Sequence, residues 1–368
     1  MLWLVTTTLN DNLLRAKFPP LLAAFPDLEL VLVTDRIGPA MERVRYIVPS
    51  RWSTRLFGRL LSRELVLFRE IARRRVRRVM VYNAVPHLLL AFLPAKLFRK
   101  PMDLHLIAGQ LDLDFAHRPR VMVNRVIRKL KNPAMLERLF RWMAFRHVSR
   151  FFVPGHRAQQ WLIAQGVDAK RICILHSAVD VQRFAPSATP RDIDVLIVAN
   201  LHPRKRPELA IQILGQVLAA RPQSRFVWIG DGYMRDEVSA RVKASPVRDA
   251  MAMVGHTDDV VRYYQRSKVF LLNSLSEGLS LATMEAMASG CVPVAADVGD
   301  MPEIIADAAT GFLIQPESSA DGYARAFLKL LSDESLRSRL SAASRDLISR
   351  DHSYAAMTSA WGNLVGAG

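Results

Sequence analysis

The 368-residue chain is poor in cysteine and has no long apolar run. Cys173 and Cys291 lie far apart and have no neighbours with the spacing of zinc ligands, which excludes a disulfide framework and favours a reducing cytosol. No apolar stretch approaches the roughly 20 residues that cross a bilayer, so an integral membrane protein is not expected. The opening MLWLVTTTLN lacks a basic leader and a cleavage site, and it predicts a first buried strand.

Motifs for metals and nucleic acids are also missing. No group of His, Cys, Asp and Glu shows metal-ligand spacing, so neither a metal nor a cofactor is expected. Zinc-finger and RNA-recognition motifs are absent as well, which makes nucleic acid an unlikely partner.

Acidic residues are scarce in one half of the chain only. Residues 1–150 contain 28 Lys and Arg against 11 Asp and Glu, whereas residues 151–368 contain 23 of each. The net charge of +17 therefore belongs to the first part. A basic surface of this kind attracts an anionic membrane, a phosphate-bearing acceptor or nucleic acid. The alternative is an arginine-rich composition on solvated helix faces.

Part of this charge follows a helical repeat. Arg51, Arg55, Arg59 and Arg63 recur every four residues, which predicts one ridge of a helix. The adjoining apolar stripe consists of Trp52, Leu56, Phe57, Leu60, Leu61 and Leu65. The stretch 118–131 repeats the mixture of basic and bulky apolar residues, and the two together predict contact with an anionic membrane surface. For either helix alone, the alternative is a stripe packed on its own sheet with the arginines in water.

Short apolar runs alternate with amphipathic stretches along the whole chain. The runs are 2–7, 28–34, 78–83, 102–108 and 150–155 in the first half, and 194–200, 225–231, 251–255, 269–274 and 291–297 in the second. Apolar strands separated by helices are typical of parallel sheets covered on both faces. The sequence therefore predicts two doubly wound α/β domains, 1–182 and 183–350, followed by a helix, 351–368, that crosses back to the first domain.

The segment SEGLSLATMEAMASGCVPVAADVGDMPEII (276–305) has the pattern of a binding site. It predicts the end of a buried strand, a tight loop and a helix capped by Ser280. Such a helix start binds phosphate through its unpaired N–H groups. Glu277 in the loop and Glu285 in the helix have carboxylates suited to sugar and ribose hydroxyls. Outside this context, Glu277 could be a solvated loop residue, and Glu285 could form an ion pair with an arginine on a helix surface.

In this context the spacing of Glu277 and Glu285 resembles the donor signature of the retaining GT-B glycosyltransferases of family GT4. DVLIVANLHPRKRPELAIQIL (194–214), FVWIGDGYMRDEV (226–238), MVGHTDDVVRYYQRSKVFLLNS (253–274) and GFLIQP (311–316) are similar to neighbouring parts of the same family. The resemblance covers about 150–360 and is weak over 1–149. It implies a GT-B fold, with two Rossmann-like domains facing a central cleft, and a nucleotide-sugar donor.

Carried over residue by residue, the resemblance implies a role for each matching position. Glu285 would bind the ribose hydroxyls, Glu277 the hydroxyls of the transferred sugar, and Lys205 the leaving diphosphate. The backbone N–H groups that would hold the diphosphate are those of Gly278, Leu279, Ser280, Leu281 and Ala282. The family does not require a metal, and no protein nucleophile is expected because the leaving phosphate assists the incoming hydroxyl.

The chain departs from the family pattern at three places. Asn200 stands where the family usually has an arginine, and Arg204 is the residue expected to replace its phosphate contact. Ser177 and Ala178 replace an Asn-Gly pair. TTTLNDN (6–12) contains no glycine, although the family has a glycine-rich loop after the first strand, so a tighter donor cleft is expected.

His105 is the candidate for the catalytic histidine of the acceptor domain, which in this family follows a strand. The alternative is a histidine whose bonds are satisfied inside the strand.

The resulting prediction is a metal-independent, retaining glycosyltransferase that acts at the cytoplasmic membrane face on a lipid-linked or cell-surface glycan intermediate. Two alternatives stay open: a nucleotide-sugar epimerase or sugar phosphorylase on the same fold, and a non-catalytic basic protein that binds membranes or nucleic acid.

Overall fold

The computed structural model describes residues 1–73, 76–117, 127 and 131–365. The chain forms two compact units, Met1–Ala178 with Tyr354–Gly368, and Val179–Ser353. The first boundary falls a few residues before the one expected from the sequence. The C-terminal helix α13 (Tyr354–Val365) belongs to the first unit, whereas the helix before it, α12 (Glu334–Asp351), belongs to the second.

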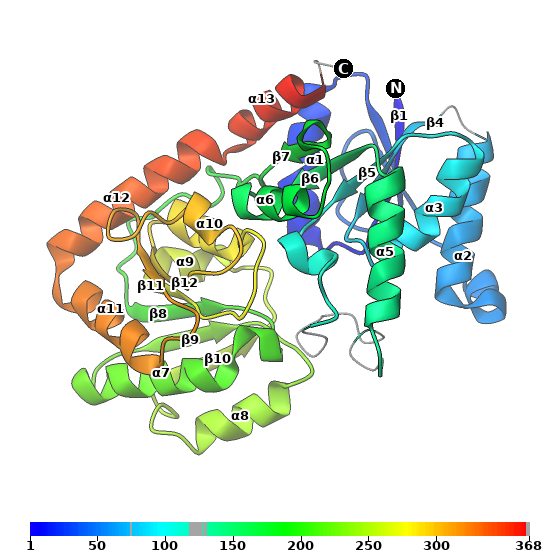
Figure 1. The fold of residues 1–368 in the computed structure, drawn as a ribbon. Coiled ribbons are helices and arrows are strands. Elements are labelled where there is room, and N and C mark those ends of the chain that lie inside the picture. Colours follow the sequence, from blue (N-terminus) through cyan, green and yellow to red (C-terminus); the bar gives the residue numbers. More distant parts are fainter. Residues whose placement is uncertain (74–75, 118–126, 128–130, 366–368) are drawn as a thin grey trace. The chain divides into compact units, whose positions relative to one another are not determined.

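The first unit is built on a seven-stranded parallel sheet with the order β3-β2-β1-β4-β5-β6-β7 (Figure 1). Its strands are β1 (Leu2–Thr6), β2 (Glu29–Val33), β3 (Val44–Ile47), β4 (Val76–Tyr82), β5 (Met102–His105), β6 (Arg150–Val153) and β7 (Ile172–Ile174). The helices are α1 (Asp11–Ala24), α2 (Arg51–Arg73), α3 (His87–Leu97), α5 (Ala134–His147), α6 (His156–Ala164) and α13.

Both faces of this sheet are buried, because two apolar clusters form on it. One cluster joins the strands to α1 and α13 through residues such as Phe18, Leu21 and Trp361. The other joins them to α2, α3 and α5 through residues such as Leu67, Leu88 and Phe140. This arrangement confirms the doubly wound layers that the apolar strands predict.

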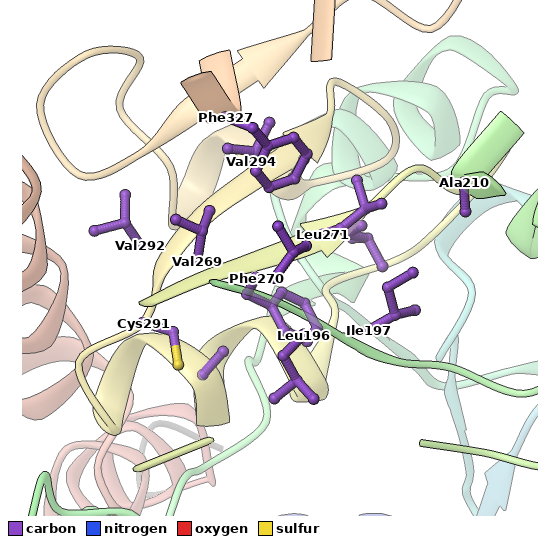
Figure 2. Close-up of a cluster of buried hydrophobic side chains, with 14 of the residues drawn as sticks. Leu196, Ile197, Ala210, Val269, Phe270, Leu271, Cys291, Val292, Val294 and Phe327 are labelled. Atoms are coloured by element: carbon purple, nitrogen blue, oxygen red, sulfur yellow. The ribbon is translucent and has the colours of Figure 1, made fainter. Parts of the chain in front are cut away.

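The second unit repeats the topology with a six-stranded parallel sheet in the order β10-β9-β8-β11-β12-β13. Its strands are β8 (Ile193–Val198), β9 (Phe226–Ile229), β10 (Met251–Gly255), β11 (Ser267–Leu272), β12 (Val292–Ala296) and β13 (Phe312–Ile314). The helices are α7 (Pro207–Ala220), α8 (Arg235–Lys243), α9 (Val261–Arg266), α10 (Leu281–Ala288), α11 (Ala320–Ser332) and α12. Apolar side chains of β8, β11 and β12 form the centre of its core (Figure 2).

The structure corrects one helix of the sequence analysis. At Gly58 the backbone of α2 is not helical (φ 73°, ψ 168°), so the four arginines do not follow one ridge. Arg51, Arg55 and Arg59 are exposed, whereas Arg63 is only 2% exposed. The predicted role of Arg63 in membrane contact is therefore wrong. The apolar stripe does not pack on the sheet either, because all six of its members are between 46% and 69% exposed.

The basic stretch 118–131 lies largely outside the described residues, which include only Ile127 and Lys131 of it. Among the described residues, no helix combines the length and the apolar character that crossing a membrane requires.

Candidate functional site

The predicted donor residues gather at the carboxyl edge of the second sheet. The strand order reverses between β8 and β11, and ligands of doubly wound sheets bind outside such a switch point. The loop after β8 carries Lys205, and the loop after β11 carries Glu277. The two side chains form an ion pair of 2.6 Å between Lys205 Nζ and Glu277 Oε1. The fold thus brings together two residues that lie 72 positions apart in the sequence.

This ion pair is largely buried, which determines its charge state. Burial alone raises the pKa of Glu277, but the positive charges of Lys205 and Arg204 outweigh it and hold the pKa at about 2. Burial also lowers the pKa of Lys205, and Glu277 opposes that shift. Glu277 is consequently an ionised hydrogen-bond acceptor at neutral pH.

The helix start next to Glu277 is built as expected. Ser280 is the N-cap of α10, and its hydroxyl oxygen accepts a hydrogen bond from the N–H of Thr283 at 3.3 Å. Within the described residues, the N–H groups of Gly278 to Ala282 donate to no protein acceptor. A helix N-terminus with free N–H groups and a partial positive charge is suited to a phosphate.

Two glycine contacts hold the neighbouring loops in place. A Cβ at Gly299 (φ 54°) would overlap the carbonyl oxygen of Glu277, and the N–H of Asp300 donates to the carbonyl of Gly278 at 2.9 Å. In the turn after β9, a Cβ at Gly230 or Gly232 would overlap the backbone of residues 199–201. The Gly-x-Gly turn therefore supports the loop after β8 by close backbone packing.

Glu285 lies one turn into α10 and is buried. The hydroxyl of Tyr264 on α9 donates to its Oε2 at 3.1 Å, and no Lys or Arg of the described chain forms an ion pair with it. Burial raises the pKa of Glu285 to about 7, although the hydrogen bond from Tyr264 and the charge of Arg183 oppose that shift. This environment rules out the surface ion pair that was the alternative reading of Glu285.

Two other predicted donor residues lie in the loop after β8. Asn200 is exposed there. The carbonyl of Arg204 accepts a hydrogen bond from the N–H of Leu275 at 2.8 Å, which ties this loop to the one that carries Glu277. Asn273 also ties these two loops together, because its side-chain amide donates to the carbonyl of Arg206 at 2.9 Å. Sequence reasoning missed Asn273 and Tyr264, because their partners lie 67 and 21 positions away, without any local motif.

The structure does not support His105 as a catalytic residue. Its imidazole is 2% exposed and lies between the rings of Tyr82 and Phe152, at centroid distances of 4.2 and 4.4 Å. Burial lowers its pKa well below the ordinary value, so the ring is neutral. This packing is that of a core residue of the first unit, which was the alternative for His105.

At the switch point of the first sheet, between β1 and β4, the loop without glycine is held by side chains. The Arg63 guanidinium donates from Nη2 to Thr6 Oγ1, to the carbonyl of Thr7 and to that of Val33, each at 3.1 Å, and from Nη1 to Asp35 at 3.2 Å. His87 contacts Thr6, Thr8 and Arg63 through its ring nitrogens at 3.1 to 3.3 Å. Asn10 then caps α1. These polar side chains tie the loop after β1 to α2 and α3.

A metal site is not apparent in the described part of the chain, which contains no group of three or more His, Cys, Asp or Glu that could hold a metal ion.

Known proteins resemble the segment that carries this site. Residues 179–347 match the family model of the glycosyl transferases group 1. Sulfoquinovosyl transferase SQD2 of Arabidopsis thaliana is 28% identical over 56% of this chain and 43% of its own length. A UDP-Gal:alpha-D-GlcNAc-diphosphoundecaprenol alpha-1,3-galactosyltransferase of Escherichia coli is 26% identical over 46% of this chain and 48% of its own. The chain spans about half the length of the curated relatives it matches.

Solved structures resemble the whole chain. Anabaena Alr3699/HepE in complex with UDP-glucose superposes with a TM-score of 0.79 at 15% identity, and the match covers 100% of both chains. Sucrose-phosphate synthase of Thermosynechococcus elongatus gives a TM-score of 0.79 at 16% identity over 100% of this chain and 98% of that one.

The two parallel sheets and these neighbours define the two-domain α/β fold of GT-B glycosyltransferases. Residues 179–347, which carry Lys205, Glu277 and Glu285, are thus similar to the glycosyl transferases group 1 family. The predicted resemblance to GT-B glycosyltransferases is thereby confirmed, whereas the retaining mode and family GT4 stay predictions.

Proposed function

We propose that this protein transfers a sugar from a nucleotide-diphosphate sugar to an acceptor hydroxyl, with retention of the anomeric configuration and without a metal. The observation that carries the proposal is the joint position of the Lys205–Glu277 pair, Glu285 and the unpaired N–H groups of α10 at one edge of the second sheet. A nucleotide sugar consists of a diphosphate, a ribose and the sugar to be transferred. This edge offers N–H groups and an ammonium group to the diphosphate, and one carboxylate to each of the two rings.

The diphosphate would lie against the start of α10. The N–H groups of Gly278 to Ala282 and the ammonium of Lys205 would bind its oxygens, and Lys205 would stabilise the negative charge that grows as the sugar leaves. Arg204 raises the local positive charge, since its guanidinium lowers the pKa of Glu277 together with Lys205. Asn200, at the exposed start of this loop, stays a predicted donor contact.

The two carboxylates would read the two sugar rings of the donor. Glu277 is ionised and would accept hydrogen bonds from the transferred sugar, while Lys205 keeps it in position. Glu285 would accept from the ribose hydroxyls, with Tyr264 fixing the orientation of its carboxyl group. The oxygen of the leaving phosphate would assist the incoming hydroxyl on the same face, so that no protein nucleophile is needed.

The acceptor is proposed to be a lipid-linked or cell-surface glycan intermediate. Two kinds of support exist: the basic charge of residues 1–150, which suits a phosphate-bearing molecule, and the relatives whose names include a diphosphoundecaprenol or a phosphatidylinositol acceptor. A cytoplasmic location at the inner membrane face agrees with the two free cysteines, Cys173 and Cys291.

The first test is a thermal-shift panel of UDP, GDP, ADP and their common sugars. A hundredfold excess of the right nucleotide over its dissociation constant should stabilise the protein by about 2.7 kcal/mol. Glu285→Ala should abolish this shift while the unliganded protein stays folded. The absence of a shift with every nucleotide would overturn the donor site.

The reaction type is tested with the nucleotide sugar identified in that panel. Proton NMR of the product reports the anomeric configuration, and activity in excess chelator reports the need for a metal. An inverted product would refute the retaining mechanism. Release of a free epimer without an acceptor, or dependence on inorganic phosphate, would reveal an epimerase or a phosphorylase, neither of which any feature of the site favours.

A further inference from the structure

Three helices of the first unit each expose an apolar ridge. The ridge of α2 after its break at Gly58 is Leu61, Leu65 and Phe68, that of α3 is Leu89, Leu93 and Leu97, and that of α5 is Met135, Leu139 and Trp142. Their members follow one another at intervals of three or four residues, so each set lies on one side of its helix. Their exposed fractions range from 37% to 72%.

These ridges are not needed for the fold. The opposite sides of the same helices already pack on the sheet, through Leu67 and Ile71 of α2, Leu88 of α3, and Phe140 and Met143 of α5. A helix of a globular protein usually carries polar residues on the side away from the core. Large apolar side chains in that position, on three helices, indicate a surface that is covered by something else.

The three ridges belong to one continuous face, because α3 contacts both α2 and α5. Figure 1 shows these helices side by side within the first unit. Aromatic contacts connect neighbouring helices. The ring centroids of Phe68 on α2 and Phe98 at the end of α3 lie 5.3 Å apart, and those of Phe92 on α3 and Trp142 on α5 lie 5.9 Å apart. We call this surface, made by the outer sides of α2, α3 and α5, the helical face. Trp52 and Leu56, at the start of α2 before its break at Gly58, are exposed as well.

The charge of the helical face has one sign. Apart from Arg69, which pairs with Glu70 at 3.2 Å, the exposed basic residues of these helices are Arg51, Arg55, Arg59, Lys96, Arg138 and Arg146. The acidic residues of these helices do not offset them, because Glu70 and Glu137 are buried and Glu64 is half-buried. Glu70 is also bonded to Arg45 and Arg69, and Glu137 to Arg141. Among the described residues of the three helices, no acidic side chain is exposed.

We infer that the helical face docks on the surface of an anionic lipid bilayer. Bulky apolar side chains surrounded by arginine and lysine are the composition of helices that lie in the membrane interface. The ridges would enter the boundary between headgroups and acyl chains, and the basic residues would contact the lipid phosphates. Tryptophans such as Trp52 and Trp142, which have an apolar ring and a polar N–H, suit this depth.

A second copy of the chain fits the helical face less well. Two such faces would bring their positive charges together without an exposed acidic residue to pair with among the described residues of these helices, and like-charge contacts oppose association. The membrane inference does not depend on the proposed transferase activity, because it rests on the surface of the first unit alone and its test needs no sugar donor.

The experiment is co-sedimentation of the full chain with vesicles of phosphatidylcholine, with and without phosphatidylglycerol. The wild type should bind the anionic vesicles and leave the neutral ones largely unbound. Leu93→Asp combined with Trp142→Asp places charge on two ridges, and it should lower the partition constant at least tenfold. The matched control is Ile163→Asp combined with Tyr233→Asp. These two side chains are 45% and 61% exposed, which is close to the 55% of Leu93 and the 50% of Trp142, but they lie outside the helical face.

A second pair of variants tests the charge. Arg51→Gln, Arg55→Gln and Arg59→Gln together should weaken binding about a hundredfold, because each basic side chain contributes about 1 kcal/mol, a factor of about five. Arg221→Gln, Arg225→Gln and Arg325→Gln remove the same charge from exposed positions of the second unit and should leave binding unchanged.

Two results would overturn the inference. One is binding to anionic vesicles that neither set of helical-face variants weakens more than its control. The other is self-association of the wild type in the absence of lipid that Leu93→Asp with Trp142→Asp abolishes, which light scattering would detect and which would assign the face to a second copy. Because all substituted side chains are exposed, circular dichroism should show unchanged folding.

Discussion

The two units share one sheet topology but differ at the edge where a ligand would bind. In the second unit, the switch point presents an ion pair, a buried carboxylate and free N–H groups. In the first unit, the corresponding edge is occupied by hydrogen bonds among Arg63, His87 and the threonines of the first loop. Strand order thus fixes where polar side chains gather, whereas the loop residues decide which groups that edge presents.

The two units also differ in net charge and in similarity to the matched family. The matched family segment, 179–347, lies within the second unit, and the excess of basic residues lies in the first 150 residues. A surface that recognises lipid headgroups needs only charge and apolar area, so its sequence leaves no comparable motif.

The largest expected effect concerns Lys205 and distinguishes its role in the transfer rate from its role in the stability of the second unit. Lys205→Met should lower the transfer rate about a thousandfold, the size expected when a group that stabilises developing charge is removed. It should also destabilise the fold by about 3 kcal/mol, because Glu277 is left buried without its partner. Adding Glu277→Gln should restore the stability measured by urea unfolding but not the rate. Restoration of both would mean that the pair is purely structural.

The corresponding variant in the first unit should affect stability alone. Arg63→Met removes a buried guanidinium that is bonded to three carbonyl or hydroxyl oxygens and to Asp35, and it should cost about 3 kcal/mol in unfolding free energy. Arg59→Met, four residues earlier and exposed, should cost less than about 0.5 kcal/mol. Vesicle binding should show the reverse order. Equal effects of the two variants on stability would contradict the burial of Arg63.

Glu285 should make the stability of the second unit depend on pH. Its pKa is raised from 4.5 to about 7 in the folded state, so the folded protein retains a proton that the unfolded chain loses. The stabilisation is complete below pH 4.5 and is lost as the pH rises to about 7, by about 3 kcal/mol in total. Glu285→Gln should remove this part of the pH dependence and leave the protein more stable at pH 8. Identical unfolding curves against pH for the two proteins would refute the buried ionisation.

The smallest effect tests the loop that carries Glu277. Gly299→Ala forces a Cβ against the carbonyl oxygen of Glu277 at a left-handed φ of 54°, and it should cost about 2 kcal/mol and weaken donor binding. Gly215→Ala is the matched control, because the space around this helical glycine of α7 is open. It should stabilise the protein by about 0.5–1 kcal/mol. A neutral Gly299→Ala would mean that the loop shifts freely.

Much of the fold is predictable from the sequence because its central strands are continuous apolar runs. All ten predicted strands are present, with ends that differ by a few residues. The three that were missed, β3, β7 and β13, are short strands, each at an edge of its sheet. Their residues are mostly half-buried, so neither an apolar run nor an alternation marks them.

The site was predictable where one short segment contains it and unpredictable where the fold assembles it. Glu277, Ser280 and Glu285 lie within nine residues and carry a recognisable spacing. The pairing of Glu285 with Tyr264 depends on the packing of α9 against the core, which no local pattern encodes. Arg63 was misplaced because a four-residue repeat was extended through Gly58, although a glycine within a helix already costs about 1 kcal/mol and signals a break.

Helix α13 has a consequence for how this chain reaches its native state. Trp361 packs against Phe152 and belongs to the apolar cluster that α1 forms on the first sheet, so the first unit lacks part of its core until α13 has been synthesised. The second unit, Val179–Ser353, is complete in the chain before that helix emerges from the ribosome. The core of the first unit is therefore complete only when segments from both ends of the given sequence come together, whereas the second unit is one continuous segment.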